Sequence, residues 1–203
     1  MAQPEDVLDF WFADAQLSPD ATAVRNEFWF SANPEIDQQI WQFFGDVVND
    51  AAAGLYDNWT DTAYGRLAMI ILLDQFPRNI FRGTSEVYRH DELALACAGQ
   101  GVTLGQLAGL TVPEQAFFLM PYQHAEDLSV QRAGVKLMQA MVDGAPDEWR
   151  EIATGYNDFA VAHHDIVAEY GRFPHRNSLL GRSSTEDEVS FLASGGETFG
   201  NAG

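Results

Sequence analysis

Residues 163–182, HHDIVAEYGRFPHRNSLLGR, join the end of a helix to a strongly basic loop. The stretch contains three arginines and three of the five histidines, although the chain has 11 Lys and Arg against 30 Asp and Glu. Its first part continues an apolar stripe at helical spacing, which predicts one long helix from Pro146 to Gly171. The stripe consists of Ile152, Tyr156, Phe159, His163, Ile166 and Tyr170. Proline and polar residues after Gly171 predict a tight loop rich in hydrogen-bond donors.

The same helical spacing recurs through the rest of the chain, and the sequence has no sustained alternation typical of strands. Asn33 before Pro34 marks one helix start, and Thr185 with Glu188 forms a capping box at another. We expect Pro77 to end one helix and Pro121 to interrupt another. The sequence therefore predicts an all-α fold, an array of about seven to nine helices packed as antiparallel pairs. It also predicts one domain over residues 1–193 and a disordered tail over 194–203.

Composition excludes several classes of protein. The formal charge of -19 predicts that the chain repels phosphate backbones and anionic membranes, so neither nucleic acid nor membrane is an expected partner. The single Cys97 excludes a disulfide within the chain and a zinc site built from cysteines. The longest apolar run, residues 67–73, is far shorter than the ~20 residues of a membrane span. The N-terminus lacks the features of a signal peptide, and we expect a soluble, cytoplasmic protein.

Asp74 is predicted to lie on the apolar face of its helix, near the C-terminal end, where a carboxylate is disfavoured. A carboxylate in this position needs a partner that neutralises it. The natural partners are Arg78, one turn further along the helix, and an arginine from the loop at 172–182.

Two strings of the sequence echo one another: FPRN at 76–79 and FPHRN at 173–177. Each follows a long helix and continues to a further arginine, Arg82 or Arg182. One explanation is ordinary punctuation, because proline and polar residues often follow helices. The other is that two loops meet at one end of the helical array. Their arginines would then face a common anion, or the internal carboxylates Asp74, Glu126 and Asp165.

Histidines and acids of the kinds that bind metals also occur, at His124, Glu126, His163, His164, Asp165 and His175. No His-Glu-x-x-His motif is present, and adjacent histidines point about 100° apart on a helix. A metal site would require the fold to bring residues 124, 163 and 175 together, and no metal is predicted. His163 lies on an apolar stripe, so we expect a core histidine hydrogen-bonded to a backbone carbonyl or a carboxylate.

Three longer strings carry a family resemblance: LAMIILLDQFPRNIFRGT (67–84), FFLMPYQHAEDLSVQ (117–131) and HHDIVAEYGRFPHRNSLLGRSSTEDEVSFL (163–192). They resemble the bacterial family catalogued as domain of unknown function 924, from VLDFWF near the start to Leu192. The resemblance implies an all-α fold similar to tetratricopeptide-like helical arrays, and it implies no established activity. The chain departs from the family pattern at His164, where an arginine is usual, and at Tyr122, where a leucine is usual.

We therefore predict a polar pocket that binds a small anionic metabolite, held by arginines that clamp its carboxylate or phosphate. The predicted ligand-binding residues are Asp74, Arg78, Asn79, His124, Glu126, His163, Arg172, His175, Arg176, Asn177 and Arg182. In one alternative, the helices accept a protein partner and the Arg/His loops are structural staples. In another, His163 or His175 is the base of a hydrolase. The sequence leaves open whether the protein is an enzyme, and no cofactor is predicted, because no phosphate loop, dinucleotide fingerprint or nucleophile elbow occurs.

Overall fold

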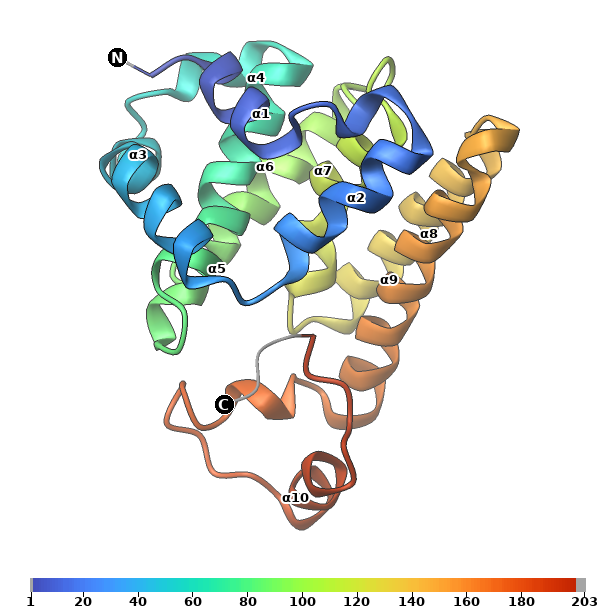
Figure 1. Cartoon of the computed structure of the whole chain (residues 1–203). Coiled ribbons are helices and arrows are strands. Elements are labelled where there is room, and N and C mark those ends of the chain that lie inside the picture. The colour runs from blue at the N-terminus through green and yellow to red at the C-terminus, as the bar shows by residue number, and fades with distance from the viewer. Residues whose placement is uncertain (1, 200–203) are drawn as a thin grey trace.

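The computed structural model describes residues 2–199, and every regular element in this range is a helix. A π turn over Ile71–Gln75 joins α4 to α5, so the ten α-helices form nine separate rods in the described part of the chain (Figure 1). The helices are α1 Pro4–Phe12, α2 Pro19–Phe30, α3 Pro34–Ala52, α4 Ala63–Ile70, α5 Phe76–Ile80, α6 Asp91–Thr103, α7 Val112–His124, α8 Leu128–Gly144, α9 Arg150–Tyr170 and α10 Glu186–Ala193. The predicted all-α class is confirmed, whereas the tetratricopeptide-like superhelix stays a prediction.

Local capping explains where the helices begin and end. The Asn33 side chain accepts a hydrogen bond of 2.9 Å from Glu35 N at the start of α3. At α10, Thr185 Oγ1 accepts from Glu188 N and the Glu188 carboxylate accepts from Thr185 N, as the capping box predicts. Gly171 ends α9 with φ of 71°, a left-handed conformation that favours glycine. The starts of α3 and α10 and the end of α9 were therefore predictable from local sequence.

Two prolines do not break their helices as expected. The π turn lets Phe76 N donate to Ile71 O, five residues back, so Pro77 falls in the first turn of α5, where a missing N–H is tolerated. Helix α7 continues through Pro121 to His124. Residues 116–121 are all buried, and packing on every side of α7 offsets a proline cost of about 3 kcal/mol. Tertiary packing and a wider turn thus overrule the local signal.

The core surrounds α7, which contacts α4, α6, α8 and α9. Phe117, fully buried in α7, packs at 4.6 Å between ring centroids against Trp29 of α2 and at 5.5 Å against Trp11 of α1. The aromatic residues near the N-terminus thus mainly build the core. They also fix the position of α7, whose last residue is His124.

The remaining described residues, 171–199, form a C-terminal lobe at one end of the helical body (orange to red in Figure 1). Its own small apolar cluster consists of Phe173 packed with Ile166 and Val167 of α9. After α10 the chain turns back toward the body, and the Phe199 ring reaches α9. Residues 200–203 of the tail for which we expect disorder lie outside the described residues, and the disorder stays a prediction.

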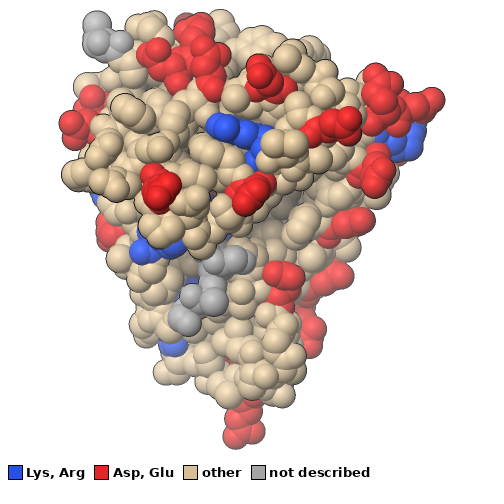
Figure 2. All heavy atoms as spheres, in the orientation of Figure 1, with Lys and Arg blue, Asp and Glu red and all other residues tan. Residues whose placement is uncertain are grey.

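The surface reflects the composition. Figure 2 shows many Asp and Glu side chains over the visible face and few Lys and Arg. Within residues 2–199, no helix combines the length and apolar character needed to cross a membrane.

Candidate functional site

Asp74 is the centre of a buried polar cluster between the helical body and the C-terminal lobe. It lies in the π turn and has no exposed surface. Its Oδ1 is 2.7 Å from Nδ1 of His124, the last residue of α7, and 3.5 Å from Arg78 Nη1. Gln75 Nε2 donates to its Oδ2 at 2.5 Å. The predicted pairing of Asp74 with Arg78 is confirmed, and the π turn is what places Asp74 and Gln75 together in this cluster.

Electrostatics keep Asp74 ionised. Burial alone would raise its pKa, but Arg78 and the hydrogen bond from His124 outweigh burial and lower the pKa to about 2. Burial and the nearby Arg78 lower the pKa of His124, which is therefore neutral at pH 7. His124 thus donates its Nδ1 proton to a carboxylate that stays charged.

Asp91, the first residue of α6, links two arginines that come from distant parts of the chain. Arg78 contacts both carboxylate oxygens, at 3.1 and 3.2 Å. Arg176, from the short 3₁₀ helix Pro174–Arg176, approaches Asp91 Oδ2 only to 3.8 Å. The two strings that echo one another in the sequence therefore meet in the structure, and the carboxylate they share is Asp91. Asp165, which was expected to face these arginines, instead contacts His164 at 2.9 Å on the outside of α9.

Arg176 is buried, with 7% of its surface exposed, yet its bonding is incomplete. Its Nη1 donates to the backbone O of His124 at 3.0 Å, while its Nε has no partner among the described residues. The guanidinium lies over the rings of Tyr88 and Phe173, at 4.5 and 4.4 Å from their centroids. Buried donors without acceptors are costly, so this arginine has unused capacity for an anion or a polar ligand.

Two more buried polar atoms next to Arg176 lack partners in the described part of the chain. They are Oη of Tyr88, at the end of the 3₁₀ helix Ser85–Tyr88, and Nδ1 of His175. Burial raises the pKa of Tyr88, so its hydroxyl stays protonated and can donate. Burial and Arg176 lower the pKa of His175 to about 4, so its ring is neutral at pH 7. Three neighbouring side chains thus offer unfilled hydrogen-bonding positions.

His163 lies one layer away, in α9. Its Nδ1 is 2.7 Å from the backbone O of Phe159, which confirms the expected core histidine bonded to a carbonyl. Its ring centroid is 6.0 Å from that of His124 and 5.7 Å from that of Phe173. Burial, His124 and Arg176 lower its pKa to about 3. His163 is therefore a neutral aromatic wall of the cluster at pH 7.

Other predicted site residues lie in ion pairs within the C-terminal lobe or between the lobe and the body. Arg182 contacts Glu126 at 2.5 and 2.9 Å, and Phe173 N donates to Glu126 at 2.7 Å. Arg172 contacts Glu188 at 2.6 and 2.8 Å. The Arg172 guanidinium holds the pKa of Glu188 down at about 2 despite its burial. Both arginines are therefore paired with carboxylates; Arg182 fastens the lobe to the body, whereas Arg172 stabilises the lobe internally.

The two asparagines are also occupied. Asn177 Nδ2 donates to Glu188 at 3.2 Å, and its Oδ1 accepts from Arg182 Nε at 2.9 Å. Asn79 Nδ2 donates at 2.8 Å to Asp37, on a different side of the α4–α5 rod from Asp74. Of the eleven predicted residues, the structure gathers six into one inner cluster and places five in these surrounding contacts. The inner six are Asp74, Arg78, His124, His163, His175 and Arg176.

The sequence did not indicate Tyr88 or Asp91, which complete the inner cluster. Asp91 begins a helix, where an acid is expected for local reasons, and this concealed its tertiary role. Tyr88 stands in a segment without helical spacing. Within residues 2–199, no group of three or more His, Cys, Asp and Glu side chains is arranged to hold a metal ion.

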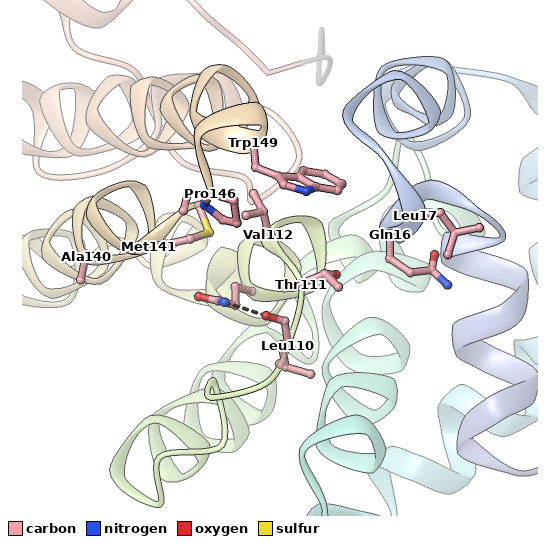
Figure 3. Close-up of a pocket in the computed structure, with 12 residues that line it drawn as sticks. Gln16, Leu17, Leu110, Thr111, Val112, Ala140, Met141, Pro146 and Trp149 are labelled. Atoms are coloured by element: carbon pink, nitrogen blue, oxygen red, sulfur yellow. Dashed lines mark hydrogen bonds between the residues drawn. The ribbon is translucent and has the colours of Figure 1, made fainter.

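A separate cavity of about 350 Å³ lies at the opposite end of α7 (Figure 3). Gln16, Leu110 to Val112, Met141 and Trp149 are among its lining residues, and none of the lining side chains is ionisable. Since α7 has 13 residues, roughly 20 Å of helix separates this cavity from His124. It offers no charge to an anion and does not belong to the Arg/His cluster.

The histidines predict how stability depends on pH. His163 and His175 have folded-state pKa values of about 3 and about 4, below the ordinary 6.5. The unfolded chain therefore binds more protons as pH falls from 6.5 toward 4, and stability is lost in that window. We expect the free energy of unfolding, measured in urea, to fall between pH 7 and pH 5 by about 1–2 kcal/mol less in His163→Phe than in the wild type. Equal losses would mean that His163 protonates freely in the folded state. Asp74 and Glu188 have pKa values near 2, so the stability that they contribute is lost at lower pH, below this window.

Comparison with known proteins agrees with the fold and names no activity. No curated protein matches the chain. A solved structure, the protein of unknown function ATU0120 from Agrobacterium tumefaciens, is similar over 94% of this chain and 97% of its own, with 34% identity and a TM-score of 0.79. The family described as "Bacterial protein of unknown function (DUF924)" matches residues 7–196. With nearly its whole length matched, the chain belongs to that family.

Proposed function

We propose that the chain binds a small anionic ligand at the inner cluster, with Arg176 as the principal contact. The observation that carries the proposal is that Arg176 is buried, yet its Nε has no partner among the described residues and its nearest carboxylate oxygen is 3.8 Å away. Tyr88 Oη and His175 Nδ1 beside it are also unpartnered. A carboxylate or phosphate is suited to such unfilled positions, because its oxygens accept several hydrogen bonds.

The charges of the cluster limit the expected affinity. Two arginines, Arg78 and Arg176, face two carboxylates, Asp74 and Asp91, and the histidines are neutral at pH 7. The site is thus neutral as a whole, and binding depends on unfilled donors rather than on excess positive charge. We expect a dissociation constant between about 1 mM and 1 µM at pH 7. For a ligand whose own charge does not change, affinity should increase as pH falls toward 4, because protonation of His175 adds a cation next to Arg176.

Tyr88→Phe gives the sharpest test, because Tyr88 Oη has no hydrogen-bond partner within residues 2–199 whose loss could destabilise the fold. We expect the affinity for inorganic phosphate or succinate, measured by calorimetry, to fall about three- to tenfold with an unchanged melting temperature. Arg176→Gln should lower affinity about 10- to 100-fold. Arg82→Gln is the matched control, since Arg82 pairs with Asp37 outside the cluster. If Tyr88→Phe and Arg176→Gln bind both anions like the wild type, Arg176 is a structural staple and the proposal is wrong.

A second candidate function follows from an apolar groove between α1 and α3, of about 610 Å³. Phe10, Phe43 and Val47 line it, Asp6 and Asp9 flank it, and Phe43 is 63% exposed. Apolar walls beside carboxylates fit a short peptide with basic and apolar side chains. A synthetic Leu/Arg peptide should bind the wild type and lose affinity in Phe43→Asp; equal binding to both would remove this candidate.

A further inference from the structure

We infer that the anion taken by this site carries a planar aromatic ring, and that Phe199 of the C-terminal segment occupies the place of that ring. The inference rests on the proposed function and names the class of its ligand. It starts from the contacts of Phe199, the last described residue.

Three rings surround Phe199. Its ring centroid is 3.5 Å from that of His163, with 12° between the planes, which is a close stack. Phe173 and His175 stand nearly perpendicular to it, with centroids at 6.5 and 6.2 Å and angles of 88° and 73°. One stacked face and two ring edges make a seat shaped for a flat aromatic group, since rings prefer these geometries.

The seat is held in place without help from Phe199. His163 is fixed by its bond to Phe159 O within α9. The backbone N of Phe173 donates to Glu126, which Arg182 also holds. A site that is already formed loses little conformational entropy when a ligand binds, so the ring of a ligand can occupy the same seat.

The segment that brings Phe199 to the seat is weakly attached. For the described residues 194–199, the hydrogen bonds run within residues 190–199, such as Phe199 N to Glu197 at 2.9 Å. Phe199 also has φ of 51°, in the left-handed region that non-glycine residues rarely adopt. A ligand ring does not bear this conformational cost and can compete for the seat.

The seat adjoins the unfilled polar positions. The Phe173 ring contacts both Phe199 and the Arg176 guanidinium, which lies 4.4 Å from its centroid. His175 likewise has its ring against Phe199 and its unpartnered Nδ1 in the polar cluster. An aromatic carboxylate or aryl phosphate therefore suits the site: its ring would replace Phe199 and its anionic group would face Arg176.

The test compares phenyl phosphate, cyclohexyl phosphate and inorganic phosphate on the full-length chain by calorimetry. Phe199→Ala removes the competing ring and should raise the affinity for phenyl phosphate about fivefold or more. The affinity for inorganic phosphate should change by less than about twofold, because phosphate has no ring to place in the seat. Phe191→Ala is the matched control, since Phe191 packs on Tyr170 rather than in the seat. With 4-fluorophenylalanine at position 199, saturating phenyl phosphate should move the fluorine resonance toward its solvent-exposed value.

The outcomes separate the two proposals. If phosphate binds but Phe199→Ala leaves phenyl phosphate unchanged, the aromatic seat is wrong and the anion site remains. If Phe199→Ala raises the affinity for cyclohexyl phosphate as much as that for phenyl phosphate, the aromatic seat is also wrong, since stacking on His163 requires a flat ring. If none of the three compounds binds either form of the protein, both the ligand class and the proposed function are wrong.

Discussion

Asp74→Ala should destabilise the protein by about 3–5 kcal/mol, measured as the free energy of unfolding in urea. Asp74 has no exposed surface and serves Arg78, His124 and Gln75 at once. Its removal leaves Arg78 with Asp91 as its remaining carboxylate and leaves the buried Nδ1 of His124 without its carboxylate acceptor. The expected effect is large because Arg78 and His124 remain largely buried after the carboxylate that neutralises one and accepts a hydrogen bond from the other is removed.

Asp74→Asn is the control that separates charge from hydrogen bonding. An asparagine can still accept from His124 or Gln75 but cannot neutralise Arg78, so we expect about half of the loss. Because the folded pKa of Asp74 is below the ordinary value, its contribution is present above about pH 4 and is lost as pH falls toward 2. The difference in unfolding free energy between the wild type and Asp74→Asn should therefore become smaller below pH 4. A loss under about 1 kcal/mol for Asp74→Ala at pH 7 would contradict the central position given to this carboxylate.

The structure divides the predicted site into two kinds of arginine. Arg172 and Arg182 are paired with carboxylates: Arg182 joins the C-terminal lobe to Glu126 of the body, and Arg172 pairs with Glu188 within the lobe. Arg176 shares Asp91 unequally with Arg78 and keeps an unfilled donor. The ligand and staple hypotheses are therefore not exclusive: the saturated pairs position the loop, and the unsaturated residue in that loop is the one proposed to bind.

Some of this site could be predicted from sequence because the reason is local. Asp74 stands out because its neighbours at helical spacing are apolar, and Arg78 is one turn away. His163 was placed correctly for the same reason, since it belongs to the apolar stripe of α9. The capping box at Thr185 gave the start of α10.

The rest depends on tertiary contacts that no local pattern encodes. Glu188 was explained fully by its capping box, and nothing in the sequence indicates that the same carboxylate also binds Arg172. The clustering of arginines and histidines indicated a polar site, but the residue types do not say which arginine lacks a carboxylate. Pro77 predicted a helix end, whereas the π turn carries the rod onward and turns Asp74 and Arg78 toward the same cluster.

Gly65→Ala should destabilise the protein by about 3 kcal/mol or more, and it tests whether the α4–α5 rod positions the site. Gly65 lies in the first turn of α4, where an added Cβ would lie 2.1 Å from the backbone O of Trp59 and 2.9 Å from Thr62 Oγ1. A backbone oxygen cannot rotate away like a side chain, so the start of the rod must move. The neighbouring Arg66, which donates to Thr60 O at 2.8 Å and Cys97 O at 2.9 Å, would be pulled with it.

Gly155→Ala is the matched control, because Gly155 lies within α9 and an added Cβ meets nothing within 4 Å. There alanine should stabilise by about 0.5–1 kcal/mol, since glycine is costly inside a helix. The α4–α5 rod carries Asp74 and Arg78, so Gly65→Ala should also weaken phosphate binding, whereas Gly155→Ala should not. If Gly65→Ala lowers stability and leaves phosphate affinity unchanged, the inner cluster is positioned by α7 and the C-terminal lobe, and the rod is only its support.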